Sequence, residues 1–95
     1  PPEEVRALLE AARIREMAKR AGVAALYVED GLLRVEFEEP PPRDALLELV
    51  RRSEAVPRFD LSGGVRVEVP LSSGDPLCRL REVGEVLEMF VGKKS

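Results

Sequence analysis

The segment from residue 23 to residue 38 constrains the fold most strongly, because its pattern is that of a β-hairpin. One strand is predicted over Val23–Glu29 and its partner over Leu32–Glu38. The Asp30-Gly31 dipeptide between them is typical of a type I′ turn, in which both central residues need a positive φ. Apolar and charged residues alternate on the second strand: Leu33, Arg34, Val35, Glu36, Phe37, Glu38. We therefore predict that one side of this strand pair is buried and the other faces solvent.

A second hairpin is predicted from about Arg58 to Pro70. Phe59 and Leu61 are expected to share a face, and Ser62-Gly63-Gly64 supplies the turn. The returning strand alternates apolar and charged residues: Val65, Arg66, Val67, Glu68, Val69. Two hairpins with apolar faces are unstable alone in water, so we expect them to join in one mainly antiparallel sheet covered by helices.

Three helices are predicted around the hairpins, over residues 3–21, 43–53 and 76–92. Asp75 as N-cap and Pro76 at the first helical position form a well-matched start for the third, and Gly22 supplies a left-handed cap for the first. Each helix is predicted to carry one apolar stripe. In the first helix the stripe is Val5, Leu8, Leu9, Ala12, Met17, Ala18 and Ala21, and Ile14 lies off it. In the second it is Leu46, Leu49 and Val50, and in the third Leu77, Leu80, Val83, Leu87 and Val91. The predicted fold class is α+β, in the order α-ββ-α-ββ-α.

Composition limits the size and the setting of this fold. At 95 residues, the chain is long enough for one domain, which we place at residues 1–92 with a frayed tail at residues 93–95. It has one cysteine and no secretory signal or long apolar run, which favours a cytoplasmic protein without a membrane partner. The net charge of −3 favours protein partners over nucleic acid.

Residues that could carry chemistry are few. The chain has no histidine, the commonest general base. Gly63-Gly64 lacks the lysine of a phosphate-binding loop and is better explained as a turn. Glu36, Glu38 and Glu39 could offer a carboxylate metal site, but a charged sheet edge is the favoured interpretation.

Two further candidates have similarly simple explanations. Glu82, Glu85 and Glu88 are spaced as a solvated helix face, and Cys78, near a helix start, has no histidine to activate it as a nucleophile. We therefore predict a domain that is not an enzyme and holds no cofactor or metal.

Basic residues gather on two helices and leave an alternative open. The clusters are Arg13, Arg15, Lys19 and Arg20 on the first helix and Arg51 and Arg52 on the second. A nucleic-acid-binding accessory domain would need these side chains on one face. A solvated face with interspersed glutamates is the favoured interpretation.

A family pattern runs along the chain. PPEEVRALLEAARIREMAKRAGV follows "lP-x-E-V" and then "LL-x-x-A-R-L-R-x-x-A-x-x-L-G-I". The matching residues are Pro2, Glu4, Val5, Leu8, Leu9, Ala12, Arg13, Ile14, Arg15, Ala18, Gly22 and Val23. LLRVEF, ALLELVRR, PRFDLSGGVRVEV and RLREVGEVLEMF follow later patterns in the same order, although both hairpin turns depart from them. In these patterns the chain resembles the C-terminal regulatory domain of bacterial transcription-repair coupling factors (Mfd).

The resemblance implies a parent protein that is an ATP-dependent DNA translocase, removes stalled RNA polymerase and recruits the repair protein UvrA. ATP, magnesium, DNA and polymerase would all bind outside these residues. The domain itself would dock on the parent's N-terminal UvrB-like module, mask the UvrA-recruiting surface and restrain the motor. The family also has a helical segment before the position of Pro1, so the resemblance implies a chain truncated there. Glu3, Glu4 and Arg6 are then the expected docking residues.

Overall fold

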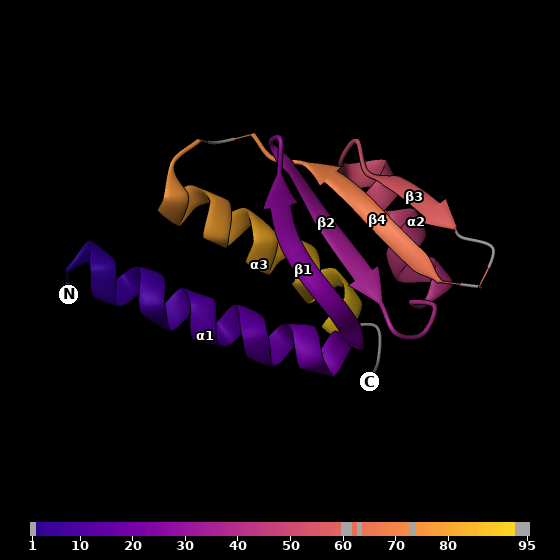
Figure 1. The fold of residues 1–95 in the computed structure, drawn as a ribbon, viewed down its shortest axis with the longest axis horizontal. Coiled ribbons are helices and arrows are strands. Elements are labelled where there is room, and N and C mark those ends of the chain that lie inside the picture. Colours follow the sequence, from indigo (N-terminus) through magenta and orange to yellow (C-terminus); the bar gives the residue numbers. More distant parts are fainter. Residues whose placement is uncertain (1, 60–61, 63, 73, 93–95) are drawn as a thin grey trace.

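The computed structural model describes residues 2–59, 62, 64–72 and 74–92. Within these ranges, three helices and four strands follow one another in the predicted α-ββ-α-ββ-α order (Figure 1). The elements are α1 (Glu3–Ala21), β1 (Val23–Glu29), β2 (Leu32–Phe37), α2 (Arg43–Arg52), β3 (Val56–Phe59), β4 (Val65–Pro70) and α3 (Pro76–Gly92). The α+β fold class is thereby confirmed, and the tail at residues 93–95 lies outside the described residues.

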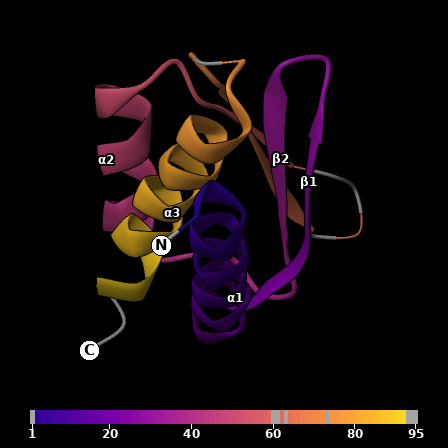
Figure 2. The ribbon, with the colours of Figure 1, turned by 90° about the vertical axis from the view of Figure 1, so that its left-hand side faces the viewer.

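The strands form one antiparallel sheet in the order β1-β2-β4-β3. The helices lie on one side of this sheet, and α3 runs between α1 and α2 (Figure 2). On the helix side of the sheet, apolar side chains face one another in the pairings Leu33↔Val69 and Val35↔Val67. The pairing Arg34↔Glu68 places charged side chains on the opposite side of the sheet. The alternation in the sequence thus separates a core face from an open, charged face.

The core lies between the sheet and α3. Its largest fully buried side chains are Phe90, Leu33, Leu49, Leu87, Val35 and Val67. The rings of Phe37 and Phe90 meet with centroids 5.0 Å apart and an interplanar angle of 59°, a tilted arrangement that aromatic pairs favour. The sheet and α3 are therefore joined by one aromatic contact within an aliphatic core.

The predicted turn of the first hairpin and the predicted caps of α1 and α3 are confirmed. Asp30 and Gly31 have φ of 53° and 74°, as a type I′ turn requires. Gly22 adopts φ 74° and ψ 33°, and its N–H donates to the carbonyls of Ala18 and Lys19, which ends α1. Asp75 Oδ2 accepts the backbone N–H of Cys78 at 3.1 Å, as expected of an N-cap.

The predicted apolar stripe of α1 is confirmed at Met17 and Ala21 but is wrong in the first half of the helix. Ile14, placed off the stripe by its spacing, is buried together with Met17 and Ala21, whereas Leu8 and Leu9 are exposed. The helix carries two apolar stripes about half a turn apart, and periodicity alone does not decide which one meets the core. The packing of α1 on α3 and β1 selects the stripe with Ile14.

Smaller corrections concern the other helices and β3. In α2, Ala45 and Leu49 are buried whereas Val50 is exposed, and the helix ends at Arg52. In α3 the stripe is centred on Val83, Leu87 and two residues that spacing missed, Val86 and Phe90. The third strand begins at Val56 with Pro57 inside it, which is tolerated because β3 is an edge strand. The predicted position of Leu61 lies outside the described residues.

Gly84 lies where α3 packs against α1. A Cβ there would lie 2.8 Å from Arg13 Nη2 and 3.7 Å from Met17 Cε. The first of these atoms ends a flexible side chain and moves at little cost, while alanine favours the helix by up to about 1 kcal/mol. We expect Gly84→Ala to change the free energy of unfolding by less than about 1 kcal/mol, and Gly84→Leu to lower it by about 1–3 kcal/mol through overpacking against Met17.

Urea denaturation measures both changes, and Gly74→Ala is the matched control because a Cβ there meets nothing within 4 Å. If Gly84→Leu is tolerated as well as Gly74→Ala, the close packing of α1 on α3 is wrong.

Candidate interaction surface

The side of α1 that faces away from the core carries an exposed apolar stripe. We call Val5, Leu8, Leu9 and Ala12 the outer stripe; they are spaced three and four positions apart and so share one side of the helix. Leu8 is 68% exposed and Leu9 is 64% exposed. Single exposed apolar residues are ordinary on proteins, but contiguous ones are typical of binding surfaces.

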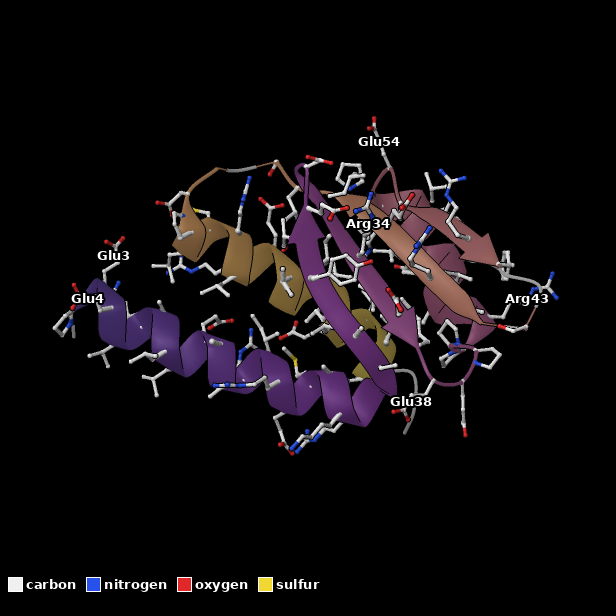
Figure 3. All side chains as sticks on the ribbon, viewed as in Figure 1. Glu3, Glu4, Arg34, Glu38, Arg43 and Glu54 are labelled. Atoms are coloured by element: carbon white, nitrogen blue, oxygen red, sulfur yellow. The ribbon has the colours of Figure 1, made fainter. Side chains whose placement is uncertain are left out.

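Two of the three expected docking residues lie beside the outer stripe. Helical geometry places Glu4 and Arg6 about a quarter of a turn to either side of it. Glu3 instead lies on the side of α1 that faces α3 (Figure 3). Both Glu3 and Glu4 line a small hollow together with Asp75 and Leu77. All three are exposed, and no carboxylate–guanidinium pair forms at any of them within the described ranges.

Ion pairs on the other side of α1 attach the helix to α3. Arg13 binds Glu10 at 2.6 Å within α1 and Glu88 of α3 at 2.9 Å. Both hydrogen bonds raise the pKa of Arg13, and the one to Glu10 has the larger effect. The outer stripe is therefore displayed by a helix whose opposite side is already engaged.

The basic clusters of α1 and α2 do not merge into one face. Arg20 lies 3.9 Å from Glu16, and Arg52 lies 2.9 Å from Glu48, each within its own helix. Figure 2 shows α3 between α1 and α2, which separates the two clusters. Within the part of the chain that the structure describes, the two clusters therefore lie apart, whereas nucleic-acid binding is favoured by one continuous basic stripe.

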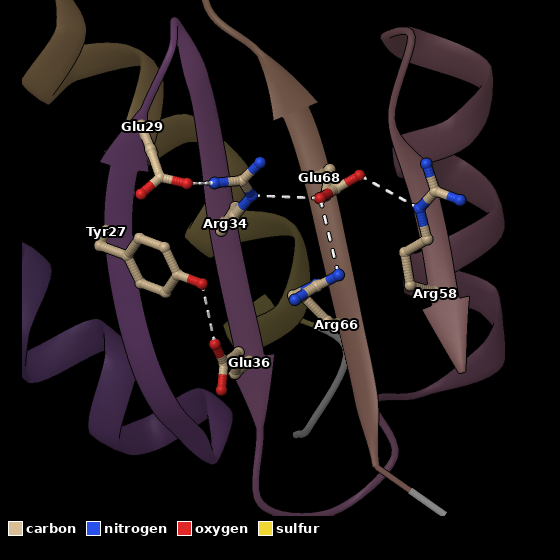
Figure 4. A network of polar contacts seen from close by, with 7 residues as sticks. All are labelled: Tyr27, Glu29, Arg34, Glu36, Arg58, Arg66 and Glu68. Atoms are coloured by element: carbon tan, nitrogen blue, oxygen red, sulfur yellow. Dashed lines mark hydrogen bonds and ion pairs between the residues drawn. The ribbon is translucent and has the colours of Figure 1, made fainter. Parts of the chain in front are cut away.

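A network of charges crosses the open face of the sheet and centres on Glu68 (Figure 4). Glu68 is 9% exposed, and its carboxylate accepts from Arg34 Nε and Arg58 Nε at 3.1 Å each. Arg66 Nη2 lies 3.8 Å away, and Glu29 binds the other side of Arg34. The pKa of Glu68 is lowered by the hydrogen bonds that it accepts, of which the one from Arg34 has the largest effect and the one from Arg58 the next largest. The pKa of Arg34 is raised, and its hydrogen bond to Glu68 is the largest cause.

This network makes stability depend on pH. The pKa of Glu68 is lower in the folded state than in the unfolded state. The contribution of Glu68 to the free energy of unfolding is therefore fully present above the ordinary glutamate pKa of about 4.3, and it is lost as the pH falls through the pKa that Glu68 has in the folded state. We expect the thermal midpoint of the wild type to fall with acidification in that range, and Glu68→Gln to have a lower midpoint at pH 7 and a flatter acid limb. Glu54→Gln is the control, since Glu54 is exposed and points away from the sheet (Figure 3). Equal midpoints for both variants at neutral pH would contradict the assignment.

The carboxylates considered for metal binding are separated. Glu36 accepts the hydroxyl of Tyr27 at 3.1 Å on the open face, and Glu38 lies beyond the end of β2. Across the described residues, no group of three or more metal-ligating side chains converges. Of the α3 glutamates, Glu82 accepts from Ser72 at 2.6 Å and Glu88 binds Arg13.

Cys78 is an exposed free thiol in the first turn of α3. The predicted Gly63-Gly64 turn falls partly outside the described residues.

Within the described ranges, none of the helices combines the length and hydropathy required to cross a membrane. Comparison of the sequence with protein-family models and curated proteins, and of the fold with solved structures, gives no match.

Proposed function

We propose that this domain is a regulatory docking module of the kind that closes the chain of transcription-repair coupling factors. The outer stripe of α1 carries the proposal: large apolar side chains remain in solvent on the side of a helix whose opposite side is fixed to α3. The same segment contains the best-matched part of the resemblance to the coupling-factor family. A surface of this kind binds a protein rather than transforms a substrate.

The partner in this proposal is the UvrB-like module of the parent protein. Leu8 and Leu9 would supply the apolar centre of the contact, with Glu4 and Arg6 on its rim, where charges set orientation and association rate more than strength. Docking would cover the UvrA-recruiting surface of that module and so restrain both recruitment and the motor. A parent of this kind acts on transcription complexes, so we place the domain in the cytoplasm.

Titration calorimetry between this domain and the UvrB-like module of the same parent tests the proposal. We expect a complex with the modest affinity typical of interfaces that must open, weakened as salt is raised because the rim charges are screened. If no heat of binding appears at low or high salt, while circular dichroism shows both partners folded, the docking proposal is wrong.

A further inference from the structure

The outer edge of β1 is a second surface that the fold leaves open. Among the strands that the structure describes, β1 pairs with β2 alone and lies at the margin of the sheet. Figure 1 shows that α1 meets β1 at its start and diverges from it toward the Asp30-Gly31 turn. Tyr27 is 38% exposed and Val28 is 42% exposed. The second half of the strand therefore presents its outer edge to solvent.

The turn that closes the first hairpin decides which backbone groups lie on this edge. In a two-residue type I′ hairpin, the residues that flank the turn form a hydrogen-bonded pair, and such pairs alternate along the strands. Glu29 and Tyr27 therefore bond to β2, whereas Leu26 and Val28 direct their N–H and C=O groups away from it. Within the described residues, neither Leu26 nor Val28 takes part in a backbone bond to a loop or cap. Two donors and two acceptors thus lie at strand spacing, a pattern that an extended backbone matches.

This part of β1 carries few of the features that protect sheet edges. Proline, lysine and inward-pointing charges discourage the addition of further strands at the edges of many sheets. The opposite edge strand, β3, contains Pro57, whereas β1 reads VAALYVE and has one charge, at its last residue. A bulge between Val23 and Ala25 disturbs only the start of β1. The edge over residues 26–29 is therefore suited to pairing with another strand.

The two sides of β1 differ in what they offer to a neighbouring strand. Leu26 and Val28 lie on the helix side of the sheet, since they pair with the buried residues Val35 and Leu33 of β2. Tyr27 lies on the open face, where a cross-strand aromatic or β-branched neighbour would stabilise the pairing. A strand beside β1 would therefore be apolar at alternate positions.

An unpaired carboxylate lies within reach of this edge. Glu36 accepts the Tyr27 hydroxyl at 3.1 Å, and within the described ranges no arginine or lysine pairs with it. Arg66, its neighbour on β4, turns toward Glu68 instead (Figure 4). Ala25 lies opposite Glu36, and its small side chain leaves the carboxylate open across β1. A strand beyond β1 would lie about 10 Å from β2, a distance that a long basic side chain and the glutamate span together.

We infer that the outer edge of β1 binds an extended, basic segment of a partner protein as a fifth, antiparallel strand. Its backbone would pair with Leu26 and Val28, and a lysine or arginine opposite Ala25 would reach Glu36. Backbone pairing and apolar contact supply most of the affinity, and Glu36 selects a basic segment over an acidic one. A second copy of β1 matches this edge less well, because VAALYVE contains no basic residue. The edge shares no residue with the outer stripe of α1, so this inference does not rest on the proposed docking.

Selection of a displayed library of random peptides, each about ten residues long, against the whole chain tests this inference. We expect the enriched peptides to alternate apolar with other residues and to contain lysine or arginine. A synthetic enriched peptide is then methylated at each backbone nitrogen in turn and measured by fluorescence anisotropy. Binding should weaken at least about 10-fold at alternate positions, whose N–H groups point toward β1, and change little at the positions between them.

Val28→Pro tests the same edge from the side of the protein. It removes an outward N–H group without taking a bond from the β1–β2 ladder, as prolines of edge strands do, and should weaken peptide binding at least about 10-fold. Val28→Thr is the matched control, because threonine keeps both the N–H group and the β-branched shape. Should Val28→Pro fail to fold by circular dichroism, Val28→Lys replaces it, since lysine at an edge opposes strand addition and repels a basic peptide.

The inference is overturned if no peptide is enriched, if the enriched peptides are acidic, or if the losses on methylation do not alternate. It is also overturned if the folded edge variant binds the peptide as the wild type does, or if sedimentation shows a dimer of this chain that this variant dissociates. Leu8→Asp should bind the peptide unchanged, and a loss there would place the peptide on the outer stripe instead of on β1. Failure at the edge leaves the α1 docking proposal to its own test.

Discussion

Replacement of Phe90 by alanine is expected to lower the free energy of unfolding by about 3–5 kcal/mol. Phe90 is fully buried, and its ring meets Phe37 at 5.0 Å, so the substitution removes both buried apolar area and an aromatic contact. The cavity would lie between α3 and the sheet, where neighbouring strands cannot collapse without losing their register. Domains of this size are typically stable by only about 5–15 kcal/mol, so a large fraction of the variant should be unfolded at elevated temperature.

Phe59→Ala is the matched control for that experiment. It deletes the same side chain from a position that is 70% exposed, where surface substitutions usually change stability by less than about 0.5 kcal/mol. Urea denaturation followed by circular dichroism gives both values. Similar losses for the two variants would mean that the core is not built around the Phe37–Phe90 contact.

The second large effect is expected on binding rather than on stability. Introducing aspartate at both Leu8 and Leu9 should weaken docking to the UvrB-like module by more than about 100-fold, because it places charge at the apolar centre of the contact. Both side chains lie in solvent in the free domain, so the thermal midpoint should stay near that of the wild type. Calorimetry gives the affinity and thermal unfolding gives the midpoint.

Leu47→Asp is the control for the binding experiment. It makes the same kind of change at an exposed leucine on α2, away from the outer stripe. We expect it to dock as the wild type does. A comparable loss for Leu47→Asp would instead place docking on the α2 side of the domain, and unchanged docking of the double variant would exclude α1 as the contact.

Local sequence signals predicted most of the fold. The predicted range of β1 matches the structure to the residue, and the Asp30-Gly31 turn marked its end because turn chemistry acts between near neighbours. Gly22 and Asp75 marked helix ends for the same reason. The start of β3 was missed because Pro57 argues against a strand, and only its place at the sheet edge makes the proline acceptable.

The candidate surface was less predictable, because it depends on contacts between distant segments. The spacing of Val5, Leu8 and Leu9 is the same whether the stripe meets the core or solvent, and only the packing of α1 on α3 decides between them. The resemblance suggests Glu4 and Arg6 as docking residues, whereas the exposed apolar residues between them were assigned to the core. The alternation in the sequence predicts a solvent-facing side of the sheet but not the network at Glu68. That network forms only when three strands lie in register, which local sequence does not specify.

The most direct test of the proposed regulatory role is whether this domain and UvrA compete for the UvrB-like module. UvrA binding to immobilised module is measured by surface plasmon resonance while this domain is added in excess. Masking predicts that the UvrA signal falls as the domain is added and recovers when the Leu8→Asp, Leu9→Asp variant replaces it. Simultaneous binding of UvrA and the domain to one module would contradict the account.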